Sequence, residues 1–188
     1  PQTTVDFYVG LLGLRLVKKS INQDVPDTYH LFFADGAGNP GTDLTFFPWA
    51  QLPPGRAGTG MWGEVSFVIP PQSMDYWEER LARAQVPAAQ PAERFGEPVL
   101  TFTDPAGMKL ALIGTELSAD QPSSVWDASP VPPEHQIRAL GSVRLTLREA
   151  ERTTRFLSQA FGFQSAGIED GWQRLVVGDG KGGQRLEL

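Results

Sequence analysis

Hydrophobic and polar positions repeat one pattern along this chain. Apolar residues recur at helical spacing in segments around Phe7, Tyr76 and Phe156, and polar residues occupy the opposite faces of these segments. The segment around Phe156 closely matches the one around Phe7, with Gly162 at the position of Gly13, and the segment around Tyr76 is a weaker copy. Such self-similarity indicates repeated structural units. We therefore expect about three copies of one supersecondary unit.

Strand-like alternation surrounds each predicted helix. Residues 64–70 precede the second helix and residues 142–147 precede the third, and in both runs apolar positions alternate with other residues. Further strand-like runs follow the helices, at 14–22, 29–35, 42–49, 98–104, 108–114, 172–179 and 184–188. The repeated unit is therefore a βαβββ module, whose curled sheet should pair with another copy around a concave cleft.

The predicted fold class is α+β, with tandem βαβββ modules that form curled mixed sheets. The first module covers residues 1–50 and lacks its opening strand, and a linker covers 51–62. The second module covers 63–115, a proline-rich linker without regular structure covers 116–136, and the third module covers 137–188. Because the chain starts without an opening strand and stops inside a strand-like run, we expect a fragment of a longer protein.

Composition narrows the classes of partner. The chain has 188 residues, of which 40% are hydrophobic and 20% charged, as in ordinary globular proteins. It has no apolar run of about 20 residues and no secretory leader pattern, so we expect a cytoplasmic protein without a membrane partner. The absence of cysteine excludes thiolate chemistry and disulfides. A net charge of −6 argues against nucleic acid and leaves small molecules or proteins as partners, with a homo-oligomer open.

Few residues are candidates for chemistry. His30 lies in a strand-like run, where a lone histidine is more often structural than a ligand, although it could line an aromatic pocket in the first module. Phe46, Phe47 and Trp49 could form the wall of the same pocket for a ring, although aromatic residues at strand positions more often belong to the core. We take His30, Phe46 and Trp49 as the candidate substrate pocket. His135, in the proline-rich linker, is expected to be a solvated surface residue.

Other polar motifs carry less weight. Glu64 and Glu187 are expected to be exposed strand residues, and Glu187 is a weak candidate metal ligand because no histidine accompanies it on its own opening strand. Residues 178–183 match the glycine-rich dinucleotide fingerprint in their letters, but a strand follows where that fingerprint requires a helix. This segment is therefore predicted to be a hairpin loop.

Three long segments resemble a known superfamily. Residues 10–49, 94–113 and 130–147 resemble the first three modules of the vicinal oxygen chelate superfamily, which includes glyoxalase I, bleomycin-resistance proteins and extradiol dioxygenases. The combination LVKKSINQD, TYHLFFAD and GTDLTFFPW is most similar to ring-cleaving dioxygenases that act on hydroquinone-type substrates. The resemblance implies Fe(II) held by two histidines and a carboxylate, a dihydroxylated aromatic substrate, O2, and a role in the degradation of aromatic compounds.

The resemblance also implies that the metal ligands lie outside these residues. The first ligand of the family is a histidine on the opening strand of module one, and the others lie in a fourth module. The carboxylate position of the modules present holds Thr45, Ala111 and Glu187, so we expect no catalytic residue and no bound metal in this chain alone. Two alternatives share the fold: a metal-free module that binds an aromatic ligand, as in bleomycin resistance, and a glyoxalase-like lyase.

Overall fold

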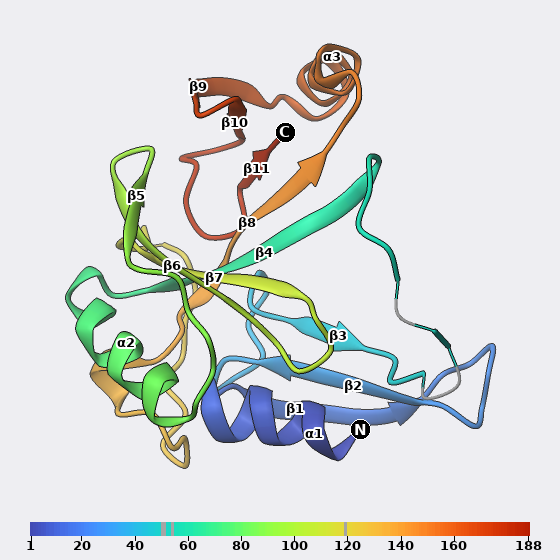
Figure 1. The fold of residues 1–188 in the computed structure, drawn as a ribbon, viewed down its shortest axis with the longest axis vertical. Helices are drawn as coiled ribbons and strands as arrows, with labels where there is room; N and C mark the ends of the chain where they lie inside the picture. Colours follow the sequence, from blue (N-terminus) through green and yellow to red (C-terminus); the bar gives the residue numbers. More distant parts are fainter. Residues whose placement is uncertain (50–51, 54, 119) are drawn as a thin grey trace.

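The first structural unit is a small sheet covered by a helix. The computed structural model describes residues 1–49, 52–53, 55–118 and 120–188, which form two sheets (Figure 1). The smaller sheet is antiparallel and contains β1 (Arg15–Ile21), β2 (Tyr29–Ala34) and β3 (Leu44–Phe46). Helix α1 (Gln2–Val5) continues as a π-helix over Asp6–Leu11 and packs against this sheet.

The larger sheet contains two complete βαβββ units. The first unit runs from β4 through α2 to β7, and the second from β8 through α3 to β11; their strand order is β5-β6-β7-β4-β8-β11-β10-β9. In each unit the last strand lies parallel to the first, β7 beside β4 and β11 beside β8. The predicted α+β fold of tandem modules is confirmed. The bounds are β4 (Met61–Ile69), α2 (Met74–Arg83), β5 (Ala92–Arg94), β6 (Glu97–Thr103), β7 (Lys109–Gly114), β8 (Ala139–Thr146), α3 (Ala150–Phe161), β9 (Gln164–Glu169), β10 (Trp172–Val176) and β11 (Arg185–Glu187).

The two units join edge to edge through their opening strands. β4 and β8 are antiparallel, and Val65 lies opposite Val143. These two valines occupy the same position in their units, so the junction is approximately two-fold symmetric. Next to this pair, the Ser66 and Ser142 hydroxyl oxygens lie 2.9 Å apart in a buried contact. A Cβ at Gly141 would lie 2.6 Å from the Ser66 hydroxyl oxygen, so a larger residue there would displace the Ser66 hydroxyl from this contact.

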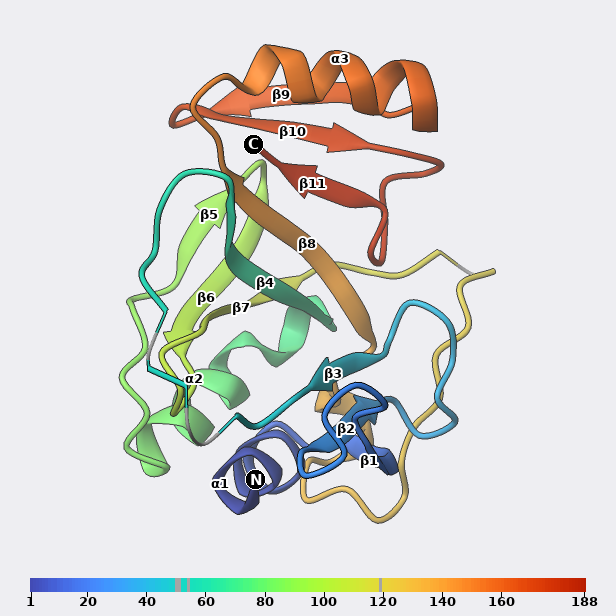
Figure 2. The ribbon, with the colours of Figure 1, turned by 90° about the vertical axis from the view of Figure 1, so that its right-hand side faces the viewer.

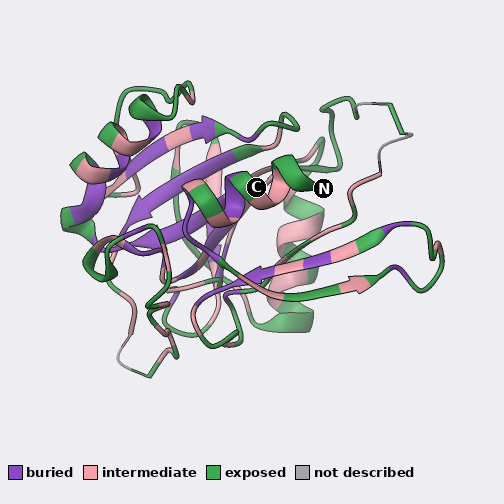
Figure 3. Cartoon of the chain, turned by 90° about the horizontal axis from the view of Figure 1, so that it is seen from below, coloured by how far each residue is buried: buried purple, intermediate pink, exposed green. Residues whose placement is uncertain are grey.

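One hydrophobic core connects the smaller sheet with the neighbouring module. It joins buried side chains of the smaller sheet and its helix to those of the β4–β7 unit, namely Phe7, Tyr8, Leu31, Phe33, Phe67, Trp77, Leu100 and Phe102. The Tyr8 hydroxyl donates a buried hydrogen bond of 3.0 Å to Asp104, in the turn between β6 and β7. Burial, and then the charge of Asp104, raise the pKa of Tyr8 far above its ordinary value. Figure 3 shows the buried residues (purple) along the interior strands and the exposed residues (green) on outer helix faces and loops.

The helix of the last module is much more exposed to solvent than the helices of the other two. Helix α3 has no buried residue, and Phe156 and Phe161 are each 60% exposed. The equivalent residue of the first repeat, Phe7, is only 6% exposed. Figure 2 shows α3 over β9 and β10, at the opposite end of the molecule from α1. The repeats thus share one topology and differ in what surrounds their helices.

The structure departs from the predicted boundaries in several places. β4 begins at Met61, inside the predicted linker, and the predicted boundary between residues 50 and 51 lies outside the described residues. The proline-rich segment was expected to lack regular structure, but Pro133–His135 form a turn of 3-10 helix because proline is well placed in a first helical turn. Within the described residues, no helix has the length and apolar character that crossing a membrane requires.

Candidate functional site

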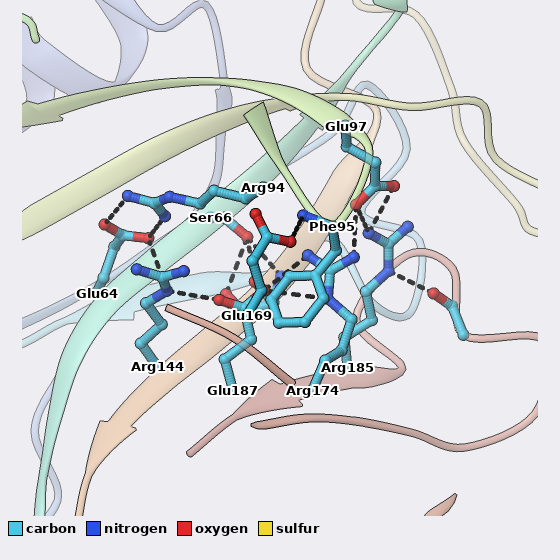
Figure 4. Close-up of polar contacts among 12 residues, drawn as sticks. Glu64, Ser66, Arg94, Phe95, Glu97, Arg144, Glu169, Arg174, Arg185 and Glu187 are labelled. Atoms are coloured by element: carbon cyan, nitrogen blue, oxygen red, sulfur yellow. Dashed lines mark hydrogen bonds and ion pairs between the residues drawn. The ribbon is translucent and has the colours of Figure 1, made fainter. Parts of the chain in front are cut away.

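Four neighbouring strands of the larger sheet carry a row of alternating charges. Glu64 on β4 lies opposite Arg144 on β8, Arg144 lies opposite Glu187 on β11, and Glu187 lies opposite Arg174 on β10. Residues directly opposite each other share one face of a sheet, so their side chains meet. Glu187 lies 2.5 Å from Arg144 and 2.7 Å from Arg174, and Glu64 lies 3.8 Å from Arg144 (Figure 4). We call these four residues the charge ladder.

Glu187 is the most buried member of the charge ladder. The residue is 1% exposed, so the expectation of an exposed strand glutamate was wrong. Burial alone would raise its pKa, but the hydrogen bonds from Arg174 and the charge of Arg144 outweigh burial and hold the pKa below its ordinary value. One carboxylate oxygen accepts from Arg144 and the other from Arg174. Glu187 is therefore an ionised partner of two guanidinium groups at neutral pH.

The larger sheet curls until its two ends meet. Glu97 on β6 accepts hydrogen bonds from Arg174 on β10, at 2.8 Å, and from Arg185 on β11, at 2.7 Å, although several strands separate them in the sheet. At the turn between β5 and β6, the Phe95 ring lies 4.1 Å from the Arg174 guanidinium, and its backbone N–H donates to Glu169 on β9. These contacts close the concave face into a partial barrel.

The curled sheet borders a hollow of about 560 Å³ that is open to solvent. That volume lies within the roughly 300–1,000 Å³ range of small-molecule sites. Its lining includes Arg94, Lys109, Arg144 and Trp172, together with Glu64. Within the described residues, three cationic side chains and one carboxylate line this space, in a chain whose net charge is −6. The barrel cavity, as we name it, is thus locally basic.

A second cluster lies on the smaller sheet, on the face opposite its helix. Leu31 and Phe33 of β2 are buried in the core, so the alternate residues His30 and Phe32 face the other way. The His30 ring centroid lies 3.9 Å from that of Phe32 and 4.0 Å from that of Phe47, and Phe47 in turn lies 6.1 Å from Trp49. We call His30, Phe32, Phe47 and Trp49 the aromatic face.

The structure brings together only part of the predicted substrate pocket. His30 and Trp49 both contact Phe47, whereas Phe46 packs on the other side, with its ring 4.6 Å from Tyr8. Successive residues of a strand point to opposite faces, so Phe46 and Phe47 cannot line one pocket. Phe32 belongs to this cluster although it was not among the expected pocket residues; its spacing of two residues from His30 was a sufficient signal.

The His30 side chain has an unused polar atom. Its Nε2 atom is buried and has no hydrogen-bond partner among the described residues. Unpaired buried polar atoms are rare in native structures and call for a partner. Burial raises the pKa of the nearby Asp43 carboxyl group, and the electrostatic interaction with His30 opposes this rise. On the same face, the Lys18 ammonium lies 5.3 Å from the Phe32 ring, so the aromatic face also presents a cation.

Two other predicted features have structural roles. His135 is not a solvated surface residue: its Nδ1 lies 3.0 Å from the Ser73 hydroxyl oxygen and its ring stacks on Tyr76 at 4.2 Å. The prediction was wrong because proximity to prolines in the sequence does not show what packs on a loop. The glycine-rich segment 178–183 connects β10 to β11 and leads into a strand, as a hairpin loop does.

The described residues do not fit an iron site. In the non-haem dioxygenases that the sequence resembles, Fe(II) prefers imidazole and carboxylate ligands grouped on one side of the metal. No group of three or more histidine, aspartate or glutamate side chains in the described ranges could hold a metal ion. Glu187 has both oxygens engaged by arginines, while the matching positions Thr45 and Ala111 offer no carboxylate. Glu187 is thus an ion-pair partner in this structure, not a ligand.

Comparisons with known proteins point to one group of enzymes. No family model matches the chain. MhqO of Bacillus subtilis (strain 168), a candidate ring-cleaving dioxygenase, is 39% identical over 174 residues, which cover 93% of this chain and 54% of MhqO. A chlorohydroquinone/hydroquinone 1,2-dioxygenase of Sphingobium indicum is 33% identical over 190 residues, which cover 100% of this chain and 59% of that enzyme. The chain thus spans just over half the length of these curated relatives.

Solved structures give the same picture. The crystal structure of a candidate dioxygenase from Bacillus subtilis superposes with a TM-score of 0.92 at 38% identity, covering 100% of this chain and 59% of that one. Glyoxalase I from Zea mays superposes with a TM-score of 0.71 at 19% identity, covering 100% of this chain and 62% of that one. At this identity, the likeness to glyoxalase I concerns the fold alone.

Proposed function

From its fold and its relatives, we propose that the whole protein is an Fe(II)-dependent extradiol-type dioxygenase that cleaves hydroquinone- or catechol-like rings. The chain has the vicinal oxygen chelate fold and is homologous to proteins named as ring-cleaving dioxygenases. One observation carries the proposal: the similarity to the chlorohydroquinone/hydroquinone 1,2-dioxygenase runs through 100% of this chain. We place the iron ligands outside these 188 residues, because the donors described here do not fit such a centre.

In this proposal the aromatic face receives the substrate ring. Phe47 is 39% exposed and leaves a flat apolar surface beside His30, onto which a second ring can stack. The unpaired Nε2 atom of His30 would exchange a hydrogen bond with a phenolic oxygen of the substrate. The chain would thereby orient the ring, and orientation is a large part of what an enzyme contributes to such a reaction.

An oxygen-uptake assay of the intact protein tests this function. The protein loaded with Fe(II) is mixed with hydroquinone in air-saturated buffer, and we expect O2 to be consumed in step with a ring-opened product that carries both oxygen atoms. His30→Phe keeps an aromatic ring but removes the hydrogen bond, so kcat/KM should fall about tenfold or more. Tyr29→Phe is the matched control, because Tyr29 neighbours His30 and contacts Lys19 rather than the aromatic face.

The same assay separates the alternatives. Hydroquinone binding without O2 consumption, with or without iron, would favour a metal-free binding protein. Isomerisation or lysis of a glutathione adduct without O2 uptake would favour a glyoxalase-like lyase. No ring-opened product from any dihydroxybenzene would refute the proposed function.

A further inference from the structure

The barrel cavity contains an arginine whose hydrogen-bonding capacity is only partly used. Arg144 donates from its Nε atom to Glu187. No described residue accepts a hydrogen bond from either of its terminal amino groups, and its side chain, which is 12% exposed, lines the cavity. The Cζ atom of its guanidinium lies 4.5 Å from the centre of the Trp172 ring, a cation–π contact. Arg144 therefore lines the cavity with terminal N–H groups that no described residue uses, and these are the groups a ligand could engage.

The other cations of the cavity differ from Arg144. Arg94 has both terminal amino groups on Glu64, at 2.6 and 3.4 Å, so its fork is already occupied. Lys109, at the start of β7, is exposed and adds a positive charge at the mouth without a fixed geometry. Pro87 and Ala88 supply an apolar wall from the segment between α2 and β5. The cavity thus combines one planar guanidinium with unused N–H groups, an exposed lysine and an apolar side.

We propose that the barrel cavity binds a small planar monocarboxylate, held by a bidentate contact to Arg144, without a metal ion. The planar fork of arginine matches the two oxygens of a carboxylate, and such paired hydrogen bonds are among the strong ones in proteins. The apolar wall and Trp172 would cover the flat body of the ligand. This inference is independent of ring cleavage on the aromatic face.

The charges behind the cavity favour a singly charged ligand. Glu64 lines the cavity, and Glu187 lies directly behind Arg144. A phosphate dianion would experience stronger repulsion from these two carboxylates than a monocarboxylate does, and its tetrahedral shape makes poorer use of a single planar fork. The arrangement therefore selects for shape as well as for charge.

Titration of the intact protein with benzoate tests the proposal. Binding is followed by calorimetry and by the NMR shift of the Trp172 indole N–H. Benzamide has the same shape without the charge and should bind at least about tenfold more weakly. Arg144→Gln should weaken benzoate binding about tenfold to a hundredfold, and Arg144→Lys, which keeps the charge but loses the fork, about tenfold.

Two further variants guard against a loss of folding in the Arg144 variants. Lys109→Gln changes an exposed side chain and should weaken binding about threefold, through charge alone. Arg152→Gln, an exposed position on α3 outside the cavity, should leave the dissociation constant unchanged. Equal affinities of the wild type and Arg144→Lys, equal binding of benzamide, or tighter binding of inorganic phosphate than of benzoate would each overturn the proposal.

Discussion

Glu187 illustrates how the role of one residue depends on the strands beside it. The sequence shows only a glutamate in a short strand-like run. In the sheet, its neighbours on the two adjacent strands are Arg144 and Arg174. That pairing depends on which strands adjoin β11 and in which register, and a single sequence does not show either. The alternation of residues along a strand was predictable, and so was the aromatic face in part. The charge ladder was not.

Removing the charge of Glu187 should destabilise the protein strongly. Glu187→Gln leaves Arg144 and Arg174 without their shared buried carboxylate, and breaking a buried ion pair costs about 3–5 kcal/mol. Urea unfolding at pH 7 measures the loss. Glu116→Gln, at an exposed position, is the control and should change the free energy of unfolding by less than about 0.5 kcal/mol.

The same variant predicts a pH dependence. Folding lowers the pKa of Glu187 from its ordinary value of 4.5, so its stabilising contribution is complete above pH 4.5 and is lost as the pH falls through the folded-state pKa. The stability difference between the wild type and Glu187→Gln should therefore be constant from pH 6 to 7 and shrink below about pH 4.5. A difference that grows on acidification would show that Glu187 is not held ionised by its arginines.

At the scale of elements, the strength of a local pattern decided what could be predicted. β4, β6 and β7 alternate or are strongly apolar, and α2 has a clear apolar stripe, so each was expected where it lies. β5 and β9 were not expected, because their residues are mostly exposed and few are apolar. Their existence depends on pairing with β6 and β10, which is a property of the assembled sheet.

The loop that leaves β2 should depend on a close contact that only glycine allows. A Cβ at Gly36 would lie 2.6 Å from the Val125 carbonyl carbon, which is backbone and cannot move aside easily. Gly36→Ala should therefore cost about 1–3 kcal/mol in thermal or urea unfolding. Gly10→Ala is the matched control: it lies in a helix with open space around it, so it should be neutral or stabilise by up to about 1 kcal/mol. Equal effects at both positions would contradict the packing of this loop on residue 125.

At the scale of the whole molecule, ion pairs between strands that are distant in the larger sheet join its two modules into a partial barrel. β4 and β8 join the modules along one side, and Glu97 joins β6 to β10 and β11 on the other. The barrel cavity is lined by residues of both modules, among them Glu64 on β4, Arg144 on β8 and Trp172 on β10. Sequence repeats predicted that the modules would pair, but the residues that close the barrel belong to no recognisable motif.

Cutting the second junction should loosen the barrel without unfolding it. Glu97 is 17% exposed, so Glu97→Gln replaces a partly screened carboxylate that serves Arg174 and Arg185, and we expect a loss of about 1–3 kcal/mol. Because the β4–β8 junction remains, amide hydrogen exchange should accelerate in β5, β6 and β10 and stay slow in β4 and β8. Glu93→Gln, an exposed change on β5, should leave exchange as in the wild type. Uniform acceleration across all strands would instead mean that the two junctions open as one unit and that the ends of the sheet have no independent closure.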